Sequence, residues 1–436
     1  MVLIQRSGVL GLLLLVGCGR WHFDTHGASA DGGADDSCAA SSCIADAAAD
    51  FNGTSTGAGG NWRYLDDHRD RTWAAMTASA GAMTGAEPGN YITTCAAHPG
   101  APACGALPGA LLVSTAGRPS TADPAIEFKT PDTQVIKLSL HAYLPSGDPQ
   151  TIRLYRNSRE DVLFTGVATA GAALERGLTL DALAGDRFLV AVEPTMTGAT
   201  DIGLQLFVSA SNAPFPSSCQ LAVPFLSGPT TSTPDLCSNT AVTHFAYPTS
   251  TPLATQLVVA SGPFPELGLA ASIPKDEFLQ RDKLLDWSGD MTVQLWVKLN
   301  SLPSTLNHAW LFDDFDFDLG GGLGLSIAAG GGTAVSLDVT ACTDTTTNPV
   351  AVGDVFTPYP TDGGWHFMRV VRTGGNVLVC LDGDYKTSLA VQAALPPGIT
   401  TYNPPRLGKD HLNRVGAFFD GRIDDVRVFT GALPCK

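Results

Sequence analysis

The sequence predicts an all-β protein with two β-sandwich domains, and three features support this prediction. Short runs in both halves alternate apolar and polar residues, such as Phe188, Val190 and Val192 in one half and Val293 and Leu295 in the other. Turn sequences such as PSGDP, LAGD, RTGGNV and LDGDY separate these runs. The chain has 436 residues, of which 44% are hydrophobic, so it is long and apolar enough for two packed cores.

The first 17 residues have the features of an export signal. Arg6 precedes an apolar run from Val9 to Val16 that is too short to span a bilayer. The sequence LVGC resembles the bacterial lipobox, and this resemblance implies cleavage and lipidation at Cys18. The alternative is an ordinary signal peptide followed by a coincidental cysteine. Because Gly19, and not Asp, follows Cys18, we expect a lipid anchor in the outer membrane as the only membrane contact.

The charge balance excludes several classes of partner. The chain has 26 Lys and Arg against 42 Asp and Glu, which gives a net charge of −16. Without a basic stripe, it lacks the electrostatic footprint of a nucleic-acid-binding protein. Anionic lipid would be repelled as well. A negative surface suits an exported protein and can attract cations.

Composition divides the rest of the chain into four parts. Residues 18–60 are rich in Ala, Gly, Ser and Asp, so they are predicted to form a disordered tether. Residues 61–212 contain strand-like runs such as QVIKLSLHAYL and DRFLVAVEP and are predicted to form a β-sandwich of unknown family. Residues 213–240 are predicted to be a linker or bridging loop, although LAVPFL within them could equally be the first strand of the next domain. Residues 241–436 form the last predicted domain.

Four motifs in this last part occur in an order typical of one family. They are MTVQLWVKL, DGGWHFMRVVRTGGNVLVCLDG, RLGK and FDGRIDDVRVFTGAL. In this order they resemble LamG-like jelly-roll domains of the concanavalin A-like lectin/glucanase superfamily. The resemblance implies two antiparallel sheets packed face to face and a role in binding a glycan or a surface protein.

The cysteine content agrees with export. Cysteines close in sequence suggest the disulfides Cys38–Cys43, Cys95–Cys104, Cys219–Cys237 and Cys342–Cys380, and the last pair lies on neighbouring strands in the family pattern. Cys435 is then free or displaces a partner such as Cys237. No group of cysteines has the spacing of a zinc site.

The acidic pair in the last motif is expected to be structural. Ile423, Val426 and Val428 should point inward, which breaks strict alternation at Asp424 and Asp425 and predicts a β-bulge. One Asp could then accept a hydrogen bond from the exposed backbone of the bulge. The other could pair with Arg422 or Arg427.

The stretch DDFDFD is the strongest candidate for a metal site. In an extended strand Asp314, Asp316 and Asp318 share one face, where neighbouring carboxylates lie about 7 Å apart. A calcium ion could join two of them if the following GGG bends the backbone. The alternative interpretation is a solvated, acidic strand end.

Nothing in the motifs indicates catalysis. A glycosidase needs two carboxyl groups at a set separation, but the last domain has only Glu266 and Glu277, both near its start. His366 is expected to be a packed, hydrogen-bonded residue. Aromatic residues could stack on a sugar, although packing is the alternative for each of Trp310, Tyr359, Tyr385 and Tyr402.

We therefore expect an exported, non-catalytic lipoprotein that binds a glycan or a protein through its jelly-roll domain, with calcium as a possible ion. One alternative is a purely structural or interaction protein without a small ligand, and the other is a relative of glycoside hydrolases. No feature of the sequence indicates an oligomeric state.

Overall fold

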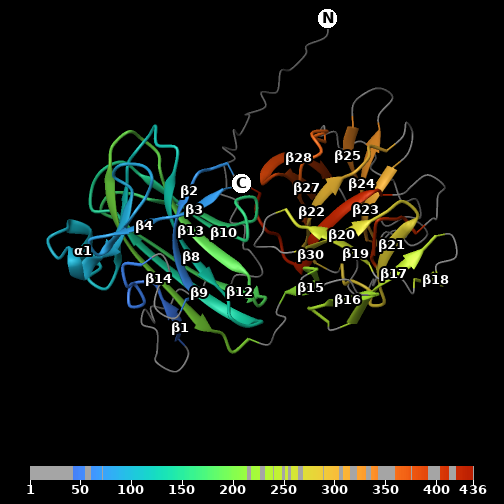
Figure 1. Ribbon diagram of the computed structural model, residues 1–436, viewed down its shortest axis with the longest axis horizontal. Coiled ribbons are helices and arrows are strands. Elements are labelled where there is room, and N and C mark those ends of the chain that lie inside the picture. Colours follow the sequence, from blue (N-terminus) through green and yellow to red (C-terminus); the bar gives the residue numbers. More distant parts are fainter. Residues whose placement is uncertain are drawn as a thin grey trace, which may run out of the picture.

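The all-β prediction is confirmed by a computed structural model of the chain, which shows two sandwiches of antiparallel strands side by side (Figure 1). The structure describes residues 43–54, 60–70, 72–213, 218–225, 231–238, 240–247, 251–253, 257–263, 269–287, 289–303, 308–314, 322–329, 335–341, 359–374, 376–390, 403–411 and 419–435. In this part of the chain no helix is long and apolar enough to cross a membrane. We name the sandwiches the first and the second domain.

The first domain consists of an eight-stranded and a six-stranded sheet. The larger sheet has the order β12 (Ala173–Ala182), β9 (Gln134–Tyr143), β14 (Thr200–Ala210), β7 (Leu111–Thr115), β6 (Tyr91–Thr94), β5 (Ala82–Thr84) and β4 (Thr77–Ser79), with β1 (Cys43–Asp46) on β14. The smaller sheet has the order β11 (Val162–Ala168), β10 (Gln150–Arg156), β13 (Arg187–Pro194), β8 (Asp123–Lys129), β2 (Trp62–Asp67) and β3 (Trp73–Ala75).

Alternation along these strands builds the core of the first domain. Val190 and Val192 of β13 and Leu206 and Val208 of β14 are buried between the sheets, because alternate side chains on a strand point to the same face. Two short helices, η1 (Cys95–Ala97) and α1 (Pro102–Ala106), lie beside the larger sheet. The disulfide Cys95–Cys104 joins them, as the cysteine spacing suggested.

The second domain also has two sheets. We name the first the junction sheet, and its order is β19 (Val258–Ser261), β20 (Leu269–Ile273), β30 (Gly421–Thr430), β22 (Met291–Leu299), β26 (His366–Thr373), β27 (Asn376–Leu381) and β28 (Asp384–Ala390), with β15 (Cys219–Val223) on β30. The outer sheet has the order β16 (Ser232–Asp235), β17 (Thr240–Ala246), β21 (Glu277–Arg281), β29 (Arg406–Leu407), β23 (His308–Asp313), β24 (Leu323–Ala329) and β25 (Val335–Ala341), with β18 (Thr251–Pro252) on β17.

The domain boundaries differ from those drawn on composition. The range 18–60 was expected to be a tether, but β1 pairs with β14 at its end and Ala47 is buried, so the first domain begins before residue 61. Small residues such as alanine suffice there because β1 adds to a sheet that already exists. The range 213–240 contains β15 and β16, which pair with β30 and β17. The alternative interpretation of LAVPFL as a strand is therefore correct for its first three residues.

The disulfides also differ in one place. Cys219 pairs with Cys237, as expected, but Cys380 of β27 bonds to Cys435 and not to Cys342. The return of the C-terminal segment along the junction sheet brings these two cysteines together, and sequence proximity could not indicate this. Cys43 is disulfide-bonded. Cys18, Cys38 and Cys342 lie outside the described residues.

Candidate functional site

The acidic pair in β30 forms the predicted β-bulge. The register of β30 on β22 shifts so that Gln294 faces Arg427 but Trp296 faces Asp424. Asp425 and Val426 together therefore stand opposite one residue, and Asp425 has a φ of 45°. Its backbone N–H donates to Asp424 Oδ1 at 2.8 Å. Because of the bulge, Ile423, Val426 and Val428 all lie in the core, as the sequence predicted.

The second aspartate of the pair takes part in a contact between the two domains. Arg427 Nε donates to Asp425 Oδ1 at 2.6 Å, and its two Nη atoms donate to Asp186 of the first domain at 3.0 and 2.7 Å. All three side chains are buried. Burial alone would raise the pKa of Asp186, but the charge and hydrogen bonds of Arg427 outweigh it and hold this pKa at about 2. The acidic pair thus helps to join the domains.

A second buried contact lies beside the first. Asp161, in the turn between β10 and β11, accepts hydrogen bonds from Arg156 Nε at 2.9 Å and Gln294 Nε2 at 3.0 Å, and it pairs with Arg369. Gln294, Arg369 and Arg427 are on the face of the junction sheet that points away from the core. The first domain therefore covers this face where Gln294, Arg369 and Arg427 lie, and a ligand cannot reach these three residues without separating the domains.

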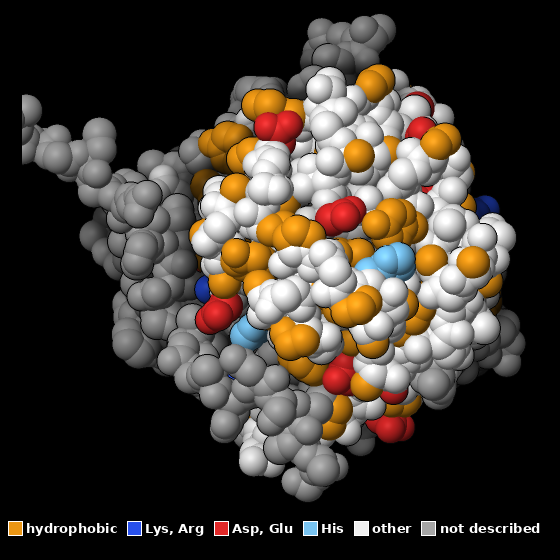
Figure 2. All heavy atoms as spheres, turned by 90° about the vertical axis from the view of Figure 1, so that its left-hand side faces the viewer, with side chains coloured by type: hydrophobic (Ala, Val, Ile, Leu, Met, Phe, Trp, Pro, Cys, Tyr) orange, Lys and Arg blue, Asp and Glu red, His pale blue; other side chains and the backbone are white. Residues whose placement is uncertain are grey.

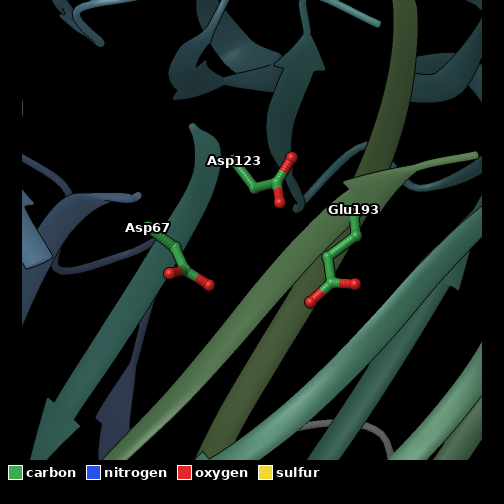
Figure 3. Close-up of side chains that lie close together, drawn as sticks. All are labelled: Asp67, Asp123 and Glu193. Carbon is green, nitrogen blue, oxygen red and sulfur yellow. The ribbon is translucent and has the colours of Figure 1, made fainter. Parts of the chain in front are cut away.

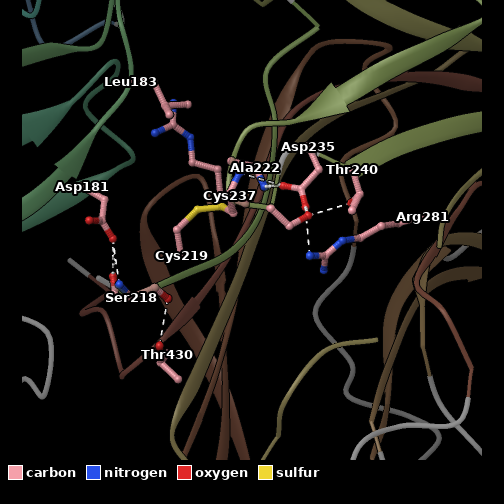
Figure 4. Close-up of a disulfide and its surroundings, with 12 residues drawn as sticks. Asp181, Leu183, Ser218, Cys219, Ala222, Asp235, Cys237, Thr240, Arg281 and Thr430 are labelled. Carbon is pink, nitrogen blue, oxygen red and sulfur yellow. Dashed lines mark hydrogen bonds and ion pairs between the residues drawn. A yellow bond between two sulfur atoms is a disulfide. The ribbon is translucent and has the colours of Figure 1, made fainter. Parts of the chain in front are cut away.

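The chain crosses between the domains at a disulfide-supported segment (Figure 4). Asp181 Oδ2 accepts hydrogen bonds from the backbone and side chain of Ser218 at 2.8 and 3.1 Å. Ser218 O in turn accepts from Thr430 N at 2.7 Å. On the other side of Cys219–Cys237, Asp235 pairs with Arg281 at 2.9 Å. This crossing fixes β15 to β30 and leaves the first domain in contact with the junction sheet.

The structure places the first residue of the predicted calcium site in the core. Asp314 is fully buried, and its carboxylate accepts hydrogen bonds from Trp287 Nε1 at 2.5 Å and Leu323 N at 2.8 Å. Gly322 has a φ of 92°, and a Cβ there would lie 2.5 Å from Asp314 O, so the turn after DDFDFD requires glycine. Asp316 and Asp318 lie outside the described residues, so the calcium site stays a prediction.

Three buried acids of the first domain were not anticipated from the sequence. Asp67, Asp123 and Glu193 lie at neighbouring positions on β2, β8 and β13, and their carboxylates point toward one another (Figure 3). Each offers an oxygen within 4.8 Å of the others, a separation that a cation could bridge. The acids are far apart in the sequence, and only the strand order of the sheet brings them together. The signal in the sequence that could have indicated them is an acidic residue at or near one end of each of these apolar strands.

Arginines already supply the positive charge at these acids. Arg159 donates to Asp67 at 3.0 Å and to Glu193 at 2.9 Å, and Arg69 pairs with Asp123. Burial, the largest effect, raises the pKa of Asp67 to about 6 in spite of Arg159. Arg153 also pairs with Glu193 at 3.2 Å, so three guanidinium groups meet three carboxylates and this cluster is an ion network of the first domain that does not require a metal.

This network makes the stability of the first domain pH-dependent. The pKa of Asp67 is about 6 in the folded chain and 3.8 without its surroundings, a difference equivalent to about 3 kcal/mol. The stabilisation is complete below pH 4 and is lost as the pH rises through 6. We expect the difference in free energy of unfolding between pH 4.5 and pH 7.5 to be smaller for Asp67→Asn, measured by urea unfolding at both pH values. An unchanged pH dependence in this variant would contradict the assignment.

A hollow at the rim of the second domain is the best candidate for a ligand site. We name it the rim hollow; its volume is about 360 Å³, including space open to solvent, and it lies between residues 299–302 and 359–364. Tyr359 is buried beneath it, and its hydroxyl makes no hydrogen bond with the described residues. Asn300, Ser301 and Thr361 provide exposed polar groups around the opening. An apolar base with a few converging polar groups is the common form of a small-ligand site.

His366 supports the rim hollow from behind. Its Nδ1 lies 2.9 Å from Asp382 Oδ2, its Nε2 lies 3.0 Å from Asp362 Oδ1, and its ring meets the edge of the Tyr359 ring. Burial, the largest single effect, lowers the pKa of His366, but the two aspartates together outweigh burial and the pKa is raised. His366 is thus a packed, hydrogen-bonded residue, as expected.

The aromatic residues that could stack on a sugar are in different environments. Trp310 and Tyr359 are buried, so packing is the correct interpretation for their rings. Tyr385 on β28 is 51% exposed, and Tyr402 lies outside the described residues. The face of the first domain shown in Figure 2 carries scattered hydrophobic and acidic side chains without a continuous basic patch.

Comparison with known proteins identifies the second domain. Residues 275–435 match the model of the concanavalin A-like lectin/glucanases superfamily, which confirms the resemblance for this part of the chain. No curated protein sequence matches the chain.

Several solved structures are similar to about half of the chain. Domain 4 of AbnA, an extracellular arabinanase of Geobacillus stearothermophilus in complex with arabinotriose, is 21% identical with a TM-score of 0.36, and the match covers 49% of this chain and 96% of that one. A botulinum neurotoxin type C structure is 13% identical with a TM-score of 0.34, covering 50% of this chain and 49% of that chain. A pentraxin of Limulus polyphemus is 14% identical with a TM-score of 0.29, covering 38% and 73%. The chain thus spans about half of the neurotoxin chain that it matches.

Proposed function

We propose that this protein is a non-catalytic, exported lipoprotein whose second domain binds a glycan at the rim hollow. The observation that carries the proposal is a hollow in a concanavalin A-like domain, with buried Tyr359 at its base, whose hydroxyl has no hydrogen-bond partner among the described residues. A buried hydroxyl without a hydrogen-bond partner lowers the stability of the fold. A hydrogen bond to a sugar hydroxyl would remove this cost. Asn300 Nδ2 and Ser301 Oγ donate to Asp420 at 3.2 and 2.6 Å, so the remaining groups that can hydrogen-bond the rest of the ring are Asn300 Oδ1, the acceptor side of Ser301 Oγ and the Thr361 hydroxyl.

The surroundings of the carboxyl groups favour binding over hydrolysis. Glycosidases place two carboxyl groups on either side of the bond that they cleave. Glu277 is the only glutamate in the described part of the second domain, and its Oε2 lies 2.7 Å from His244 Nε2. Asp314 and Asp425 are buried in hydrogen bonds of the fold. These acids are occupied by contacts within the protein.

A glycan array tests the proposal. We expect the protein to retain at least one sugar, and Tyr359→Phe with Asn300→Ala to weaken that binding by about tenfold, since two hydrogen bonds are lost. Tyr91→Phe is the matched control, because Tyr91 lies in the first domain, and it should bind as the wild type does. The absence of any retained sugar, or an unchanged affinity in the double variant, would refute the proposal. Release of sugar by EDTA would support the calcium site at Asp314, Asp316 and Asp318.

The anchor is a separate part of the proposal. LVGC at the end of a signal-like segment supports lipidation of Cys18 and attachment to the outer membrane. Metabolic labelling with palmitate should mark the wild-type protein and leave Cys18→Ser unlabelled. Equal labelling of both would contradict the anchor and would leave the glycan proposal to its own test.

A further inference from the structure

A groove between the two domains has the features of a second ligand site. We name it the junction groove; its volume is about 620 Å³, including space open to solvent. Both domains form its walls: β11 and β12 on one side, and the segment from Phe429 to Leu433 on the other. The apolar side chains of the walls are mainly aliphatic and come from Leu163, Leu178, Leu180, Phe429, Ala432 and Leu433.

Two arginines line the same groove. Arg176 makes no ion pair with a carboxylate among the described residues, its guanidinium lies 5.6 Å from the centre of the Phe164 ring, and its Nε is buried without a hydrogen-bond partner. Arg156 is 3% exposed and bonds Asp161 through Nε, while its Nη2 also lacks a partner. Buried donors without acceptors are costly, so the groove is built to receive an acceptor.

The acid that lines the groove does not supply this acceptor. Asp181 Oδ2 is occupied by the backbone and side chain of Ser218 (Figure 4). Asp161 forms ion pairs with both Arg156 and Arg369, so one carboxylate is shared by two guanidinium groups. Among the described residues, the guanidinium of Arg176 therefore lacks a carboxylate partner in the groove. An anion is the complementary ligand.

We propose that the junction groove binds an amphiphilic carboxylate, meaning a molecule with an alkyl body and one carboxylate group. The planar guanidinium of Arg176 suits a carboxylate, which accepts two parallel hydrogen bonds. Asp181 and the chain's net charge of −16 repel a carboxylate with one charge less than they repel a phosphate with two charges. The leucines on both walls contact the alkyl body, and its burial supplies the apolar part of the affinity.

Binding at this place connects the two domains. A ligand there contacts β12 and the C-terminal segment together, so it binds the assembled chain and not the separated domains. It must then stabilise the assembled chain in proportion to its occupancy. This site is distinct from the rim hollow, and its test does not depend on the glycan proposal.

Isothermal titration calorimetry of the full chain with decanoate, below its micelle concentration, tests the proposal. We expect binding of one decanoate per chain, and we expect decanol and decylamine, which share the alkyl body, to bind at least tenfold more weakly. Arg176→Gln should weaken decanoate binding about tenfold or more, because a hydrogen bond to a charged group is lost. The absence of decanoate binding to the wild type, or equal binding of decanol, would overturn the proposal.

Two control variants locate the site. Arg153→Gln removes an arginine of β10 that pairs with Glu193 at 3.2 Å and does not line the groove, and its affinity for decanoate should equal that of the wild type. Tyr359→Phe, at the rim hollow, should also leave decanoate binding unchanged. If Arg176→Gln binds decanoate as tightly as the wild type does, or if Arg153→Gln loses as much affinity, decanoate is bound elsewhere and the assignment to the junction groove is wrong.

Discussion

Replacement of Arg427 by methionine is expected to lower the free energy of unfolding by about 3–5 kcal/mol, because removing one partner of a buried ion pair leaves the other charge buried. Two carboxylates lose their cation in this variant, Asp186 of the first domain and Asp425 of the bulge. The pKa of Asp186, held at about 2 by Arg427, should rise in the variant. The loss should therefore be greatest at neutral pH, where Asp186 is ionised in the wild type. Urea unfolding followed by tryptophan fluorescence measures it.

The control for this prediction is Lys386→Met. Lys386 pairs with Asp384 on the surface at 3.9 Å, and such exposed pairs contribute about 0–1 kcal/mol. The double variant Arg427→Met with Asp186→Asn should be less destabilised than the sum of the single variants, since the uncompensated charge is removed with its partner. Equal unfolding midpoints for Arg427→Met and Lys386→Met would show that the contact between the domains contributes little to stability.

Much of the second domain could be predicted because the alternation of apolar residues within a strand directly indicates which side chains point into the core. Strict alternation from Val293 to Val297 determines which face of β22 points into the core of the second domain. The step of three residues from Ile423 to Val426, both in the core, requires a bulge at the acidic pair. Both signals lie within one strand. The short-range disulfides Cys95–Cys104 and Cys219–Cys237 could be inferred for the same reason.

The features that were missed depend on contacts between distant parts of the chain. Asp186 and Arg427 are 241 residues apart, and the sequence suggested for the acidic pair only a partner within its own strand. Asp67, Asp123 and Glu193 become neighbours through the order of strands in a sheet. β1 has too few apolar residues to be recognised alone, and it is a strand because β14 offers it a free edge. The position of Asp314 follows from Trp287, which reaches it from another segment.

The disulfide between Cys380 and Cys435 is another contact between distant parts of the chain. It closes a loop of 55 residues, and in the chain-entropy account a loop of this length contributes about 4 kcal/mol. We therefore expect Cys380→Ser with Cys435→Ser to lower the free energy of unfolding of the second domain by about 4 kcal/mol, measured by urea unfolding. The double variant avoids leaving a reactive thiol. Cys95→Ser with Cys104→Ser, which opens a separation of 9 residues in the first domain, should cost the second domain nothing.

This disulfide should also control the junction groove, because Cys435 ends the segment that forms one of its walls. Pro434 O accepts a hydrogen bond from Arg369, the same arginine that pairs with Asp161. Without the disulfide, the end of this segment is held by that hydrogen bond and by the bond from Leu433 N to Thr292 at 3.0 Å, while Gly431 stays bonded to Asp290 and Thr292. Decanoate affinity should then fall together with stability in the double cysteine variant, whereas sugar binding at the rim hollow should be retained. A variant as stable as the wild type would show that packing of this segment is sufficient to fix the wall of the groove.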